Sequence, residues 1–329
     1  MNFILIKLFF SVVISFLLTY YFVPIFIKIA HKFSIIDHPD GVVKKHKTPT
    51  PYLGGAAIYL GILTTLGITF PFDNQFFLFL VGCTILFYVG LIDDLIALRP
   101  SQKFAGQAVA VLCFLKAGFY LKSHIFYNYW NIPISALWML IIINAFNLID
   151  IMDGLAGTVA LFCSLSFLFI ALLMHNYTVA LLLCSFIGAL TAFFIFNRPK
   201  ARIYLGDAGS LFIGGFFATI PFLYNWGTIN WHGYLVPLII LAIPLLEVGG
   251  LILLRTAKNI PFYHPSPDHF AIYLKNKGFG PYQILIFVMA ASIILMICSI
   301  LFVQGLIDIV AVLVLGSFFL LFWLYCIFL

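Results

Sequence analysis

The stretch Thr178-Val-Ala-Leu-Leu-Leu-Cys-Ser-Phe-Ile-Gly-Ala-Leu-Thr-Ala-Phe-Phe-Ile-Phe196 contains no charged residue. A helix of this length is long enough to cross the roughly 30 Å hydrocarbon layer of a bilayer. Of the 329 residues, 64% are hydrophobic and only 9% are charged, whereas ordinary soluble domains carry about 25% charged residues. The composition therefore excludes a soluble globular protein and predicts helices in lipid.

Apolar runs like this one recur from one end of the chain to the other. They predict an all-α, polytopic membrane bundle of 10–11 transmembrane helices, formed by a single domain over residues 1–329. The expected spans lie near residues 3–30, 53–71, 76–92, 105–121, 133–150, 156–173, 178–196, 209–224, 234–254, 282–303 and 307–328.

The basic residues indicate how the bundle is oriented. If the loop 31–52 is cytoplasmic, fourteen of the seventeen lysines and arginines fall in cytoplasmic loops or the adjoining helix ends. Cytoplasmic loops of membrane proteins carry such an excess of positive charge. The distribution predicts an N-terminus outside and a C-terminus inside the cell.

The acidic residues divide in the same way. Eight of the eleven acids fall on the predicted cytoplasmic side, whereas Asp73, Glu247 and Asp308 do not. Even mild scales give a cost of about 2.5–3.5 kcal/mol for an acid at the centre of a membrane helix. Acids gathered at the ends of apolar helices on one membrane face indicate a shared cation.

Two adjacent acids, Asp93 and Asp94, end the third predicted span, and Arg99 and Lys103 follow them. Two carboxylates about 4 Å apart repel each other by roughly 4 kcal/mol at an effective dielectric constant of 20. A divalent ion or the nearby basic groups must offset this repulsion, and one acid could act as a general base. The alternative is a pair of solvated acids that mark the membrane boundary.

A polar stripe closes the fifth predicted span. Its residues are three positions apart, so they share one face of a helix, and Gly154 and Gly157 follow. Such polar groups can link helices by hydrogen bonds, but four in ten residues favour a functional site. The stripe consists of Asn144, Asn147, Asp150 and Asp153.

A glycine-rich turn, Gly206-Asp207-Ala208-Gly209-Ser210, opens the eighth predicted span after a basic loop. Mg²⁺ takes one or two carboxylates together with phosphate oxygens, and the N-terminus of a helix attracts phosphate. The turn therefore suits a metal and phosphate site. The alternative is that Asp207 or Ser210 only caps the helix.

Two cytoplasmic loops carry further candidates. The first contains Lys44-Lys45-His46-Lys47, a charge run that either meets anionic headgroups or binds a lipid phosphate. The last, from Arg255 to Phe270, contains His264 and His269 among several prolines, which indicates a shaped loop able to reach a polar ligand.

Together these motifs resemble the bacterial polyprenyl-phosphate N-acetylhexosamine-1-phosphate transferases, a glycosyltransferase family 4 group, over the chain from His46 to His269. The resemblance implies a multi-pass enzyme of the bacterial cytoplasmic membrane with a cytoplasmic cleft. There a polyprenyl phosphate, such as undecaprenyl phosphate, would attack the β-phosphate of a UDP-N-acetylhexosamine and release UMP. The reaction would depend on Mg²⁺, with Mn²⁺ as an alternative.

The resemblance also implies roles for individual residues. The predicted catalytic residues are Asp93, as base or partner of the lipid phosphate, Asp94 beside it, and Asp207. Asp207 and Asn147 would hold the metal. The predicted substrate-binding residues are Asp150 and Asp153 at the nucleotide, Lys47 and Lys103 at phosphates, and His269 at the sugar-nucleotide.

One departure bears on the substrate. Family members usually have two or three closely spaced histidines in the last loop, whereas here His264 and His269 are five residues apart. This argues against the members that use a peptide-bearing sugar and favours N-acetylglucosamine (GlcNAc) in the first membrane step of a cell-envelope glycan pathway. Nothing indicates nucleic acid binding, and a homodimer stays open.

The alternative from another class is an ion-coupled secondary transporter that uses the intramembrane carboxylates. Such sites lie near the bilayer midplane on broken helices, commonly between repeated halves. Here the acids crowd one face and no repeat is visible, so the sequence favours the transferase.

Overall fold

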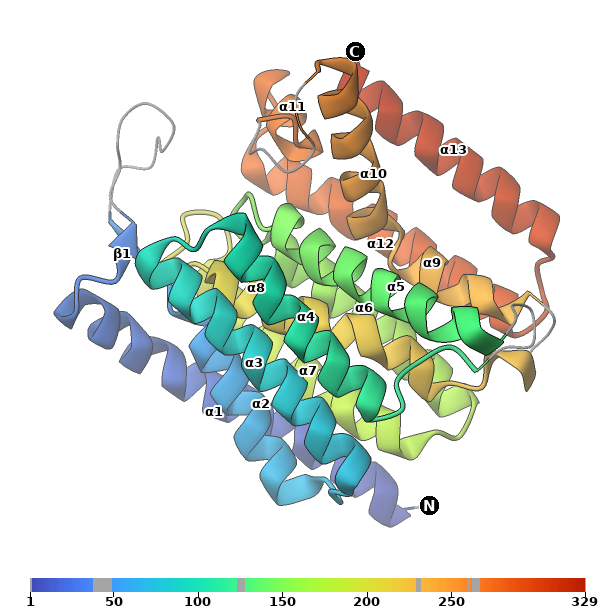
Figure 1. Ribbon diagram of the computed structural model, residues 1–329, viewed down its shortest axis with the longest axis horizontal. Helices are drawn as coiled ribbons and strands as arrows, with labels where there is room; N and C mark the ends of the chain where they lie inside the picture. The colour runs from blue at the N-terminus through green and yellow to red at the C-terminus, as the bar shows by residue number, and fades with distance from the viewer. Residues whose placement is uncertain are drawn as a thin grey trace.

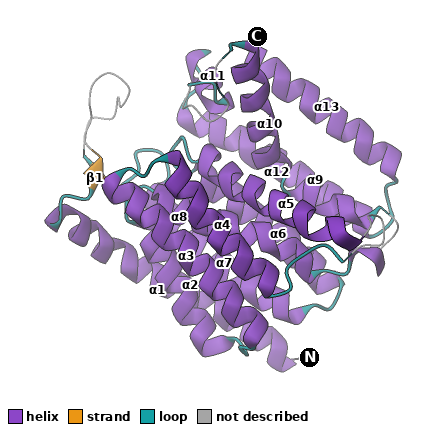
Figure 2. Cartoon of the chain, in the orientation of Figure 1, coloured by secondary structure: helices purple, strands orange, loops and turns teal. Residues whose placement is uncertain are grey.

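The computed structural model describes residues 2–37, 49–122, 128–228, 232–259, 261 and 267–328. Helices make up almost all of this chain (Figure 2). The α-helices are α1 (Asn2–Lys32), α2 (Gly54–Thr69), α3 (Asn74–Ile96), α4 (Pro100–Lys116), α5 (Asn128–Ile149), α6 (Leu155–Leu173), α7 (Tyr177–Asn197), α8 (Gly206–Thr219), α9 (Val236–Ile240), α10 (Ala242–Ala257), α11 (Phe270–Asn276), α12 (Pro281–Val303) and α13 (Ile309–Phe328). Short 3₁₀ turns are η1 (Ile220–Leu223), η2 (Trp226–Thr228) and η3 (Gly233–Leu235), and two-residue strands β1 (Ile36–Asp37) and β2 (Thr50–Pro51) pair antiparallel.

Each of the eleven predicted apolar runs contains a helix, which confirms an all-α, polytopic membrane bundle. Within the described residues, seven helices are long and apolar enough to cross a membrane, and the bent pair α9–α10 would make an eighth crossing. Helix α2 and the described part of α13 are apolar but shorter. The count of 10–11 spans therefore stays a prediction.

The predicted span 234–254 is not one straight helix, because α9 and α10 meet at an angle of 72°. Pro244 lies in the first turn of α10 and has no N–H to donate to the carbonyl of Ile240. The Cys163 thiol of α6 donates to this carbonyl instead, with an Sγ–O distance of 3.3 Å. The bend follows from proline chemistry that hydrophobicity alone does not reveal.

Helix α4 begins five residues before the predicted span 105–121. Pro100 occupies its first turn, where a missing N–H costs nothing. The Arg99 N–H donates to Oε1 of Gln102 over 3.0 Å and satisfies the helix start. As a result Lys103, expected in a loop, lies on the first turns of a helix.

The spans α7 and α8 form the centre of the bundle. In each of them, 78% of the residues in the most apolar 18-residue segment are buried. Helix α8 packs against α3 and α5, and α7 packs against α1 and α6. Figure 1 shows the two chain termini at opposite ends of the molecule, with α10 and α11 at the end near the C-terminus. The start of α8, which carries Asp207, is thereby held by helices distant in the sequence.

Helices α3 and α8 approach closely at Gly90. A Cβ atom at this position would lie 2.2 Å from the backbone carbonyl oxygen of Asp207, and backbone atoms there have no room to move aside. Glycine at residue 90 is therefore what allows the acids of α3 to reach the start of α8.

We expect Gly90→Ala to lower the free energy of unfolding by about 1–3 kcal/mol, the usual cost of overpacking a core. Thermal unfolding of the purified protein in detergent measures the change. Gly67→Ala in α2 is the matched control, because a Cβ there meets nothing within 4 Å. Equal unfolding temperatures for the two variants would contradict the close contact.

Candidate active site

The ammonium group of Lys103 joins three of the predicted site residues. Its Nζ lies 2.8 Å from Oδ2 of Asp93 and 2.5 Å from Oδ2 of Asp207. It also donates to Oδ1 of Asn147 over 3.3 Å. Residues from α3, α4, α5 and α8 thus meet at one point, as the sequence predicted for Asp93, Asn147 and Asp207.

The acids at this point are close enough to need a cation. The carboxyl groups of Asp93 and Asp207 lie within hydrogen-bonding distance of each other. Nδ2 of Asn147 donates to Oδ1 of Asp207 over 2.8 Å and to Oγ of Ser210 over 3.0 Å. Lys103, predicted to face phosphates, forms ion pairs with both Asp93 and Asp207.

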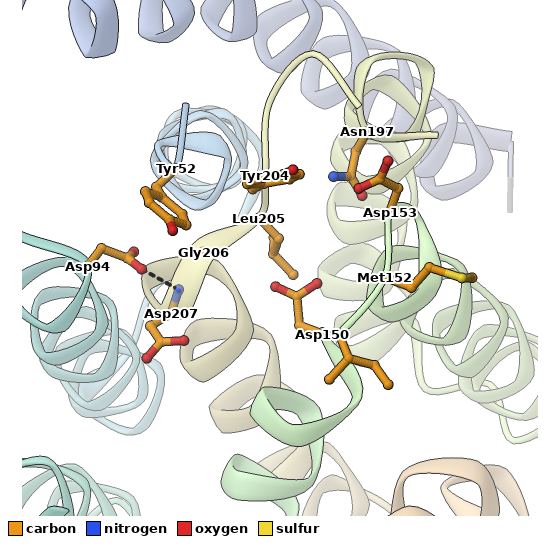
Figure 3. Close-up of a pocket in the computed structure, with 11 residues that line it drawn as sticks. Tyr52, Asp94, Asp150, Met152, Asp153, Asn197, Tyr204, Leu205, Gly206 and Asp207 are labelled. Carbon is orange, nitrogen blue, oxygen red and sulfur yellow. Dashed lines mark hydrogen bonds between the residues drawn. The ribbon is translucent and has the colours of Figure 1, made fainter. Parts of the chain in front are cut away.

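Asp94 has a different environment from its neighbour Asp93. Its Oδ1 accepts the N–H of Asp207 over 2.8 Å and its Oδ2 accepts the N–H of Ala208 over 3.0 Å. These are N–H groups at the start of α8, which otherwise lack intrahelical partners (Figure 3). Neither Asp207 nor Ser210 caps α8, because Asp94 of α3 satisfies its first N–H groups.

Gly206 makes this contact possible. It has a φ of +72°, which favours glycine, and a Cβ there would lie 2.7 Å from Oδ2 of Asp94. A side chain at residue 206 would push the Asp94 carboxylate away from the helix start. The glycine-rich turn therefore serves the contact between α3 and α8.

The predicted stripe of four polar residues is divided by the structure. Nδ2 of Asn144 donates to Gln107 over 2.9 Å and links α5 to α4, the structural role weighed for such groups. Asn147 reaches the acid cluster. Helix α5 ends at Ile149, so Asp150 and Asp153 lie in the following turn and not on a helix face. The prediction of one continuous stripe was wrong.

The turn after α5 forms one wall of a pocket of about 290 Å³. Four carboxylates from three different segments line this pocket, together with the rings of Tyr52 and Tyr204 (Figure 3). The four acids are Asp94, Asp150, Asp153 and Asp207. A small hollow with so many acids attracts a cation and the anionic ligand bound to it.

Asp150 follows the end of α5, and its pKa is shifted by its surroundings. Burial, and then the neighbouring carboxylates of Asp207, Asp94 and Asp153, raise the pKa of Asp150 well above its ordinary value. The pocket is therefore strongly electronegative and disfavours a further negative charge unless a cation is present.

Asp153 is held by the loop between α7 and α8. Its Oδ2 accepts the N–H of Ala201 over 3.0 Å. Nearby, Oδ1 of Asn197 accepts the N–H of Gly154, and its Nδ2 donates to the carbonyl of Ile203. Asn197 thereby fixes both the turn that carries Asp153 and the loop segment that leads to Asp207. Sequence reasoning missed Asn197, although an amide at the end of an apolar helix was a visible signal.

Two predicted site residues remain, Lys47 and His269. Lys47, like His264, lies outside the described residues. His269 begins α11 and forms an ion pair or hydrogen bond with Glu247 of α10, with Nδ1 and Oε1 2.8 Å apart. Glu247, which was not expected on the cytoplasmic side, is thus the partner of a predicted site residue.

The acid cluster is not a complete metal site by itself, but it could bind a metal together with substrate phosphates. Among the described residues, no group of three histidine, cysteine or acidic side chains is arranged to hold a metal alone. Mg²⁺ commonly binds one or two carboxylates and completes its shell with water and substrate phosphates. The Asp207 carboxylate and Oδ1 of Asn147 are oxygen ligands of the kind Mg²⁺ accepts, and both contact Nζ of Lys103 in this structure.

Comparison with known proteins gives a consistent result. The sequence profile described as glycosyl transferase family 4 matches residues 76–225, which include the acids of α3, the turn after α5 and the start of α8. A phospho-N-acetylmuramoyl-pentapeptide-transferase of Bacillus mycoides (strain KBAB4) is 32% identical over 237 residues, or 64% of this chain and 72% of the relative.

Two relatives with a different activity in their names match more of the chain. The probable undecaprenyl-phosphate N-acetylglucosaminyl 1-phosphate transferase of Bacillus subtilis (strain 168) is 26% identical over 84% of this chain and 79% of the relative. The undecaprenyl-phosphate alpha-N-acetylglucosaminyl 1-phosphate transferase of Thermotoga maritima is 29% identical over 85% of each.

We expect Asp150→Asn to raise the unfolding temperature at neutral pH by about 2 °C or more in metal-free buffer. Because the pKa of Asp150 is raised in the folded protein, the associated stability is complete below the ordinary carboxyl pKa of about 4 and is lost as the pH rises. The variant avoids this loss. Thermal unfolding from about pH 4 to pH 8 measures the effect, and a constant difference between the proteins at every pH would contradict it.

Proposed function

This chain belongs to glycosyl transferase family 4, and from that premise we propose that it transfers an N-acetylhexosamine-1-phosphate from a UDP-sugar to undecaprenyl phosphate. An oxygen of the lipid phosphate attacks the β-phosphorus of the UDP-sugar. The bond from this phosphorus to the bridging oxygen breaks, and UMP leaves. The products are a polyprenyl diphosphate sugar and UMP.

The observation that carries the proposal is the meeting of three separate motifs at Lys103. Its ammonium contacts Asp93 of α3, Asn147 of α5 and Asp207 of α8. Phosphoryl transfer depends mainly on positioning and on neutralising charge. A pocket lined by acids, one of which is paired with Lys103, supplies groups that can do both for an anionic substrate.

We propose GlcNAc-1-phosphate as the transferred group. Relatives named N-acetylglucosaminyl 1-phosphate transferases match 82–85% of this chain. Relatives named phospho-N-acetylmuramoyl-pentapeptide-transferases match 63–65%. The wider match and the separated histidines of the last loop both favour the smaller sugar, although they leave open which glycan the product feeds.

We propose Mg²⁺ as the cofactor, with Mn²⁺ able to replace it, held by Asp207 and Asn147. When bound, the ion would neutralise the charge of the substrate diphosphate. A diphosphate, a lipid phosphate and four carboxylates repel one another strongly. Two like unit charges 4 Å apart repel each other by roughly 4 kcal/mol even at a dielectric constant of 20. Lys103 alone does not balance this charge.

The residues of the chain then have separate tasks. Asp93 faces the lipid phosphate and takes the proton that the attacking group still carries. Asp94 keeps Asp207 in place through the start of α8. Asp150 and Asp153 line the part of the pocket that receives the nucleotide. Lys103 holds Asp93 and Asp207 at a fixed distance and also supplies positive charge for a phosphate.

We propose the bacterial cytoplasmic membrane as the location, with the N-terminus outside and the pocket facing the cytoplasm. The positive charge of the loops near the pocket supports this orientation. The termini at opposite ends of the bundle agree with an odd number of crossings (Figure 1). An N-terminal tag on intact spheroplasts should react with an impermeant antibody, and a tag protected until the membrane is opened would contradict the orientation.

The transporter alternative is not favoured. Its coupling sites would lie near the middle of the membrane, whereas the carboxylates here meet at helix ends, beside the end of α5 and the start of α8. The relatives found by comparison are named as transferases.

The test uses purified protein, undecaprenyl phosphate, Mg²⁺ and a panel of radiolabelled UDP-sugars. We expect UDP-GlcNAc to give a lipid-soluble product and an equal amount of UMP, and EDTA to stop the reaction until Mg²⁺ is restored. Asp93→Asn and Asp207→Asn should each reduce turnover by at least about 100-fold, because each removes a charge at the reacting groups.

Asp73→Asn is the matched control. Asp73 caps α3 by accepting the N–H of Phe76, a bond that asparagine can also accept, so the variant loses one charge far from the pocket. It should keep normal turnover. Normal turnover in Asp93→Asn or Asp207→Asn would reject the assigned roles, and ion-driven uptake without a lipid product would favour the transporter.

A further inference from the structure

Glu247 lies in the middle of α10, within an apolar run, and its side chain is 1% exposed. A carboxylate in such a place is costly unless it is paired and hydrogen-bonded. Nothing in the acid cluster around Lys103 uses this residue. The buried Glu247 carboxylate must therefore pair with other groups of the protein, and that pairing can have a function of its own.

The partner is the start of α11. Oε1 of Glu247 lies 2.8 Å from Nδ1 of His269, and the carboxylate also accepts the backbone N–H of Phe270. His269 itself is buried and occupies the N-cap position of α11. Both atoms that Glu247 binds belong to the point where the last cytoplasmic loop becomes a helix.

The neighbouring residue of the loop is anchored separately. Asp268 accepts from Nζ of Lys258 in a short ion pair and from the hydroxyl of Tyr273 over 2.9 Å. Lys258 ends α10 and Tyr273 belongs to α11. Asp268 and His269 are thus attached by two different side chains, Lys258 and Glu247. A substitution can therefore remove one attachment and leave the other in place.

The bond to Glu247 decides which nitrogen of His269 is available. A carboxylate only accepts hydrogen bonds, so Nδ1 must carry a proton when it faces Glu247. Nε2 is then the nitrogen left for a ligand, as acceptor when the ring is neutral and as donor when it is charged. Carboxylates behind catalytic and metal-bound histidines fix the ring in this way.

We infer that Glu247 is a positioning residue that holds His269 in one tautomer and one orientation toward the sugar-nucleotide. The inference rests on the proposed function and on the family resemblance, which implies that His269 contacts this substrate. After the 72° bend, α10 lies at the end of the bundle that carries α11 (Figure 1). An acid in a membrane run thereby serves a loop outside it.

The functional test compares Glu247→Leu, Glu247→Gln and His269→Ala in the UDP-GlcNAc assay. Glu247→Leu should lower kcat/KM by about 10- to 100-fold, as removal of such carboxylate partners usually does. Glu247→Gln should lose less, because its amide oxygen can still accept from Nδ1. The double variant Glu247→Leu/His269→Ala should be no slower than His269→Ala, because Glu247 acts through the ring.

Tyr273→Phe is the matched control for a general loosening of the loop. It removes the hydroxyl that binds Asp268 but leaves Glu247 and His269 untouched. Its kcat/KM should stay within about twofold of the wild type. An equal loss in Tyr273→Phe and Glu247→Leu, or fully multiplying losses in the double variant, would overturn the positioning role.

A second measurement does not depend on activity. The chain has eight histidines, so ¹⁵N-histidine labelling gives a tractable spectrum in which His269→Ala identifies the signal of His269. We expect a protonated Nδ1 in the wild type and its loss in Glu247→Leu. If the wild type transfers nothing from any UDP-sugar, the proposed function fails, whereas an unchanged Nδ1 signal in Glu247→Leu would overturn the pairing itself.

Discussion

The contact of Asp94 with the start of α8 is the constraint on which the site depends. One carboxylate accepts two backbone N–H groups, from Asp207 and Ala208, across two helices distant in the sequence. This contact requires glycine at residues 90 and 206, where any side chain would collide with the partner. Because it fixes α3 against α8, it also fixes Asp93 next to Asp207. Asp94 thus holds the structure of the site, and we propose that Asp93 beside it takes part in the chemistry.

The electrostatic consequence follows from this arrangement. Acids brought so close together raise the cost of every further negative charge, yet the proposed substrates carry several. Lys103 offsets part of the repulsion by contacting Asp93 and Asp207 at once. The remaining imbalance favours ligands that arrive with a divalent cation. We therefore propose that the pocket favours phosphate esters bound to a divalent cation over free anions.

Hydropathy was enough to predict the helices, and the motifs with their family resemblance predicted the meeting of Asp93, Asn147 and Asp207. They did not predict the start of α4, where Pro100 begins a helix, or the end of α5 before Asp150, because both depend on local backbone hydrogen bonds. Asn197 and Glu247 were missed for a further reason. Each is a single polar residue whose partner lies far along the chain, and periodicity within one segment carries no information about such a partner.

The bend between α9 and α10 shows how a cost in one place permits a function in another. Pro244 deprives the carbonyl of Ile240 of its helical partner, and the Cys163 thiol provides a weaker substitute. In exchange, α10 takes a new direction and carries Glu247 to His269. Glu247 is thereby paired with a base instead of lying alone among apolar side chains. The bend sets the direction of α10, and Glu247 in this helix binds His269. The bend and the buried acid are therefore linked.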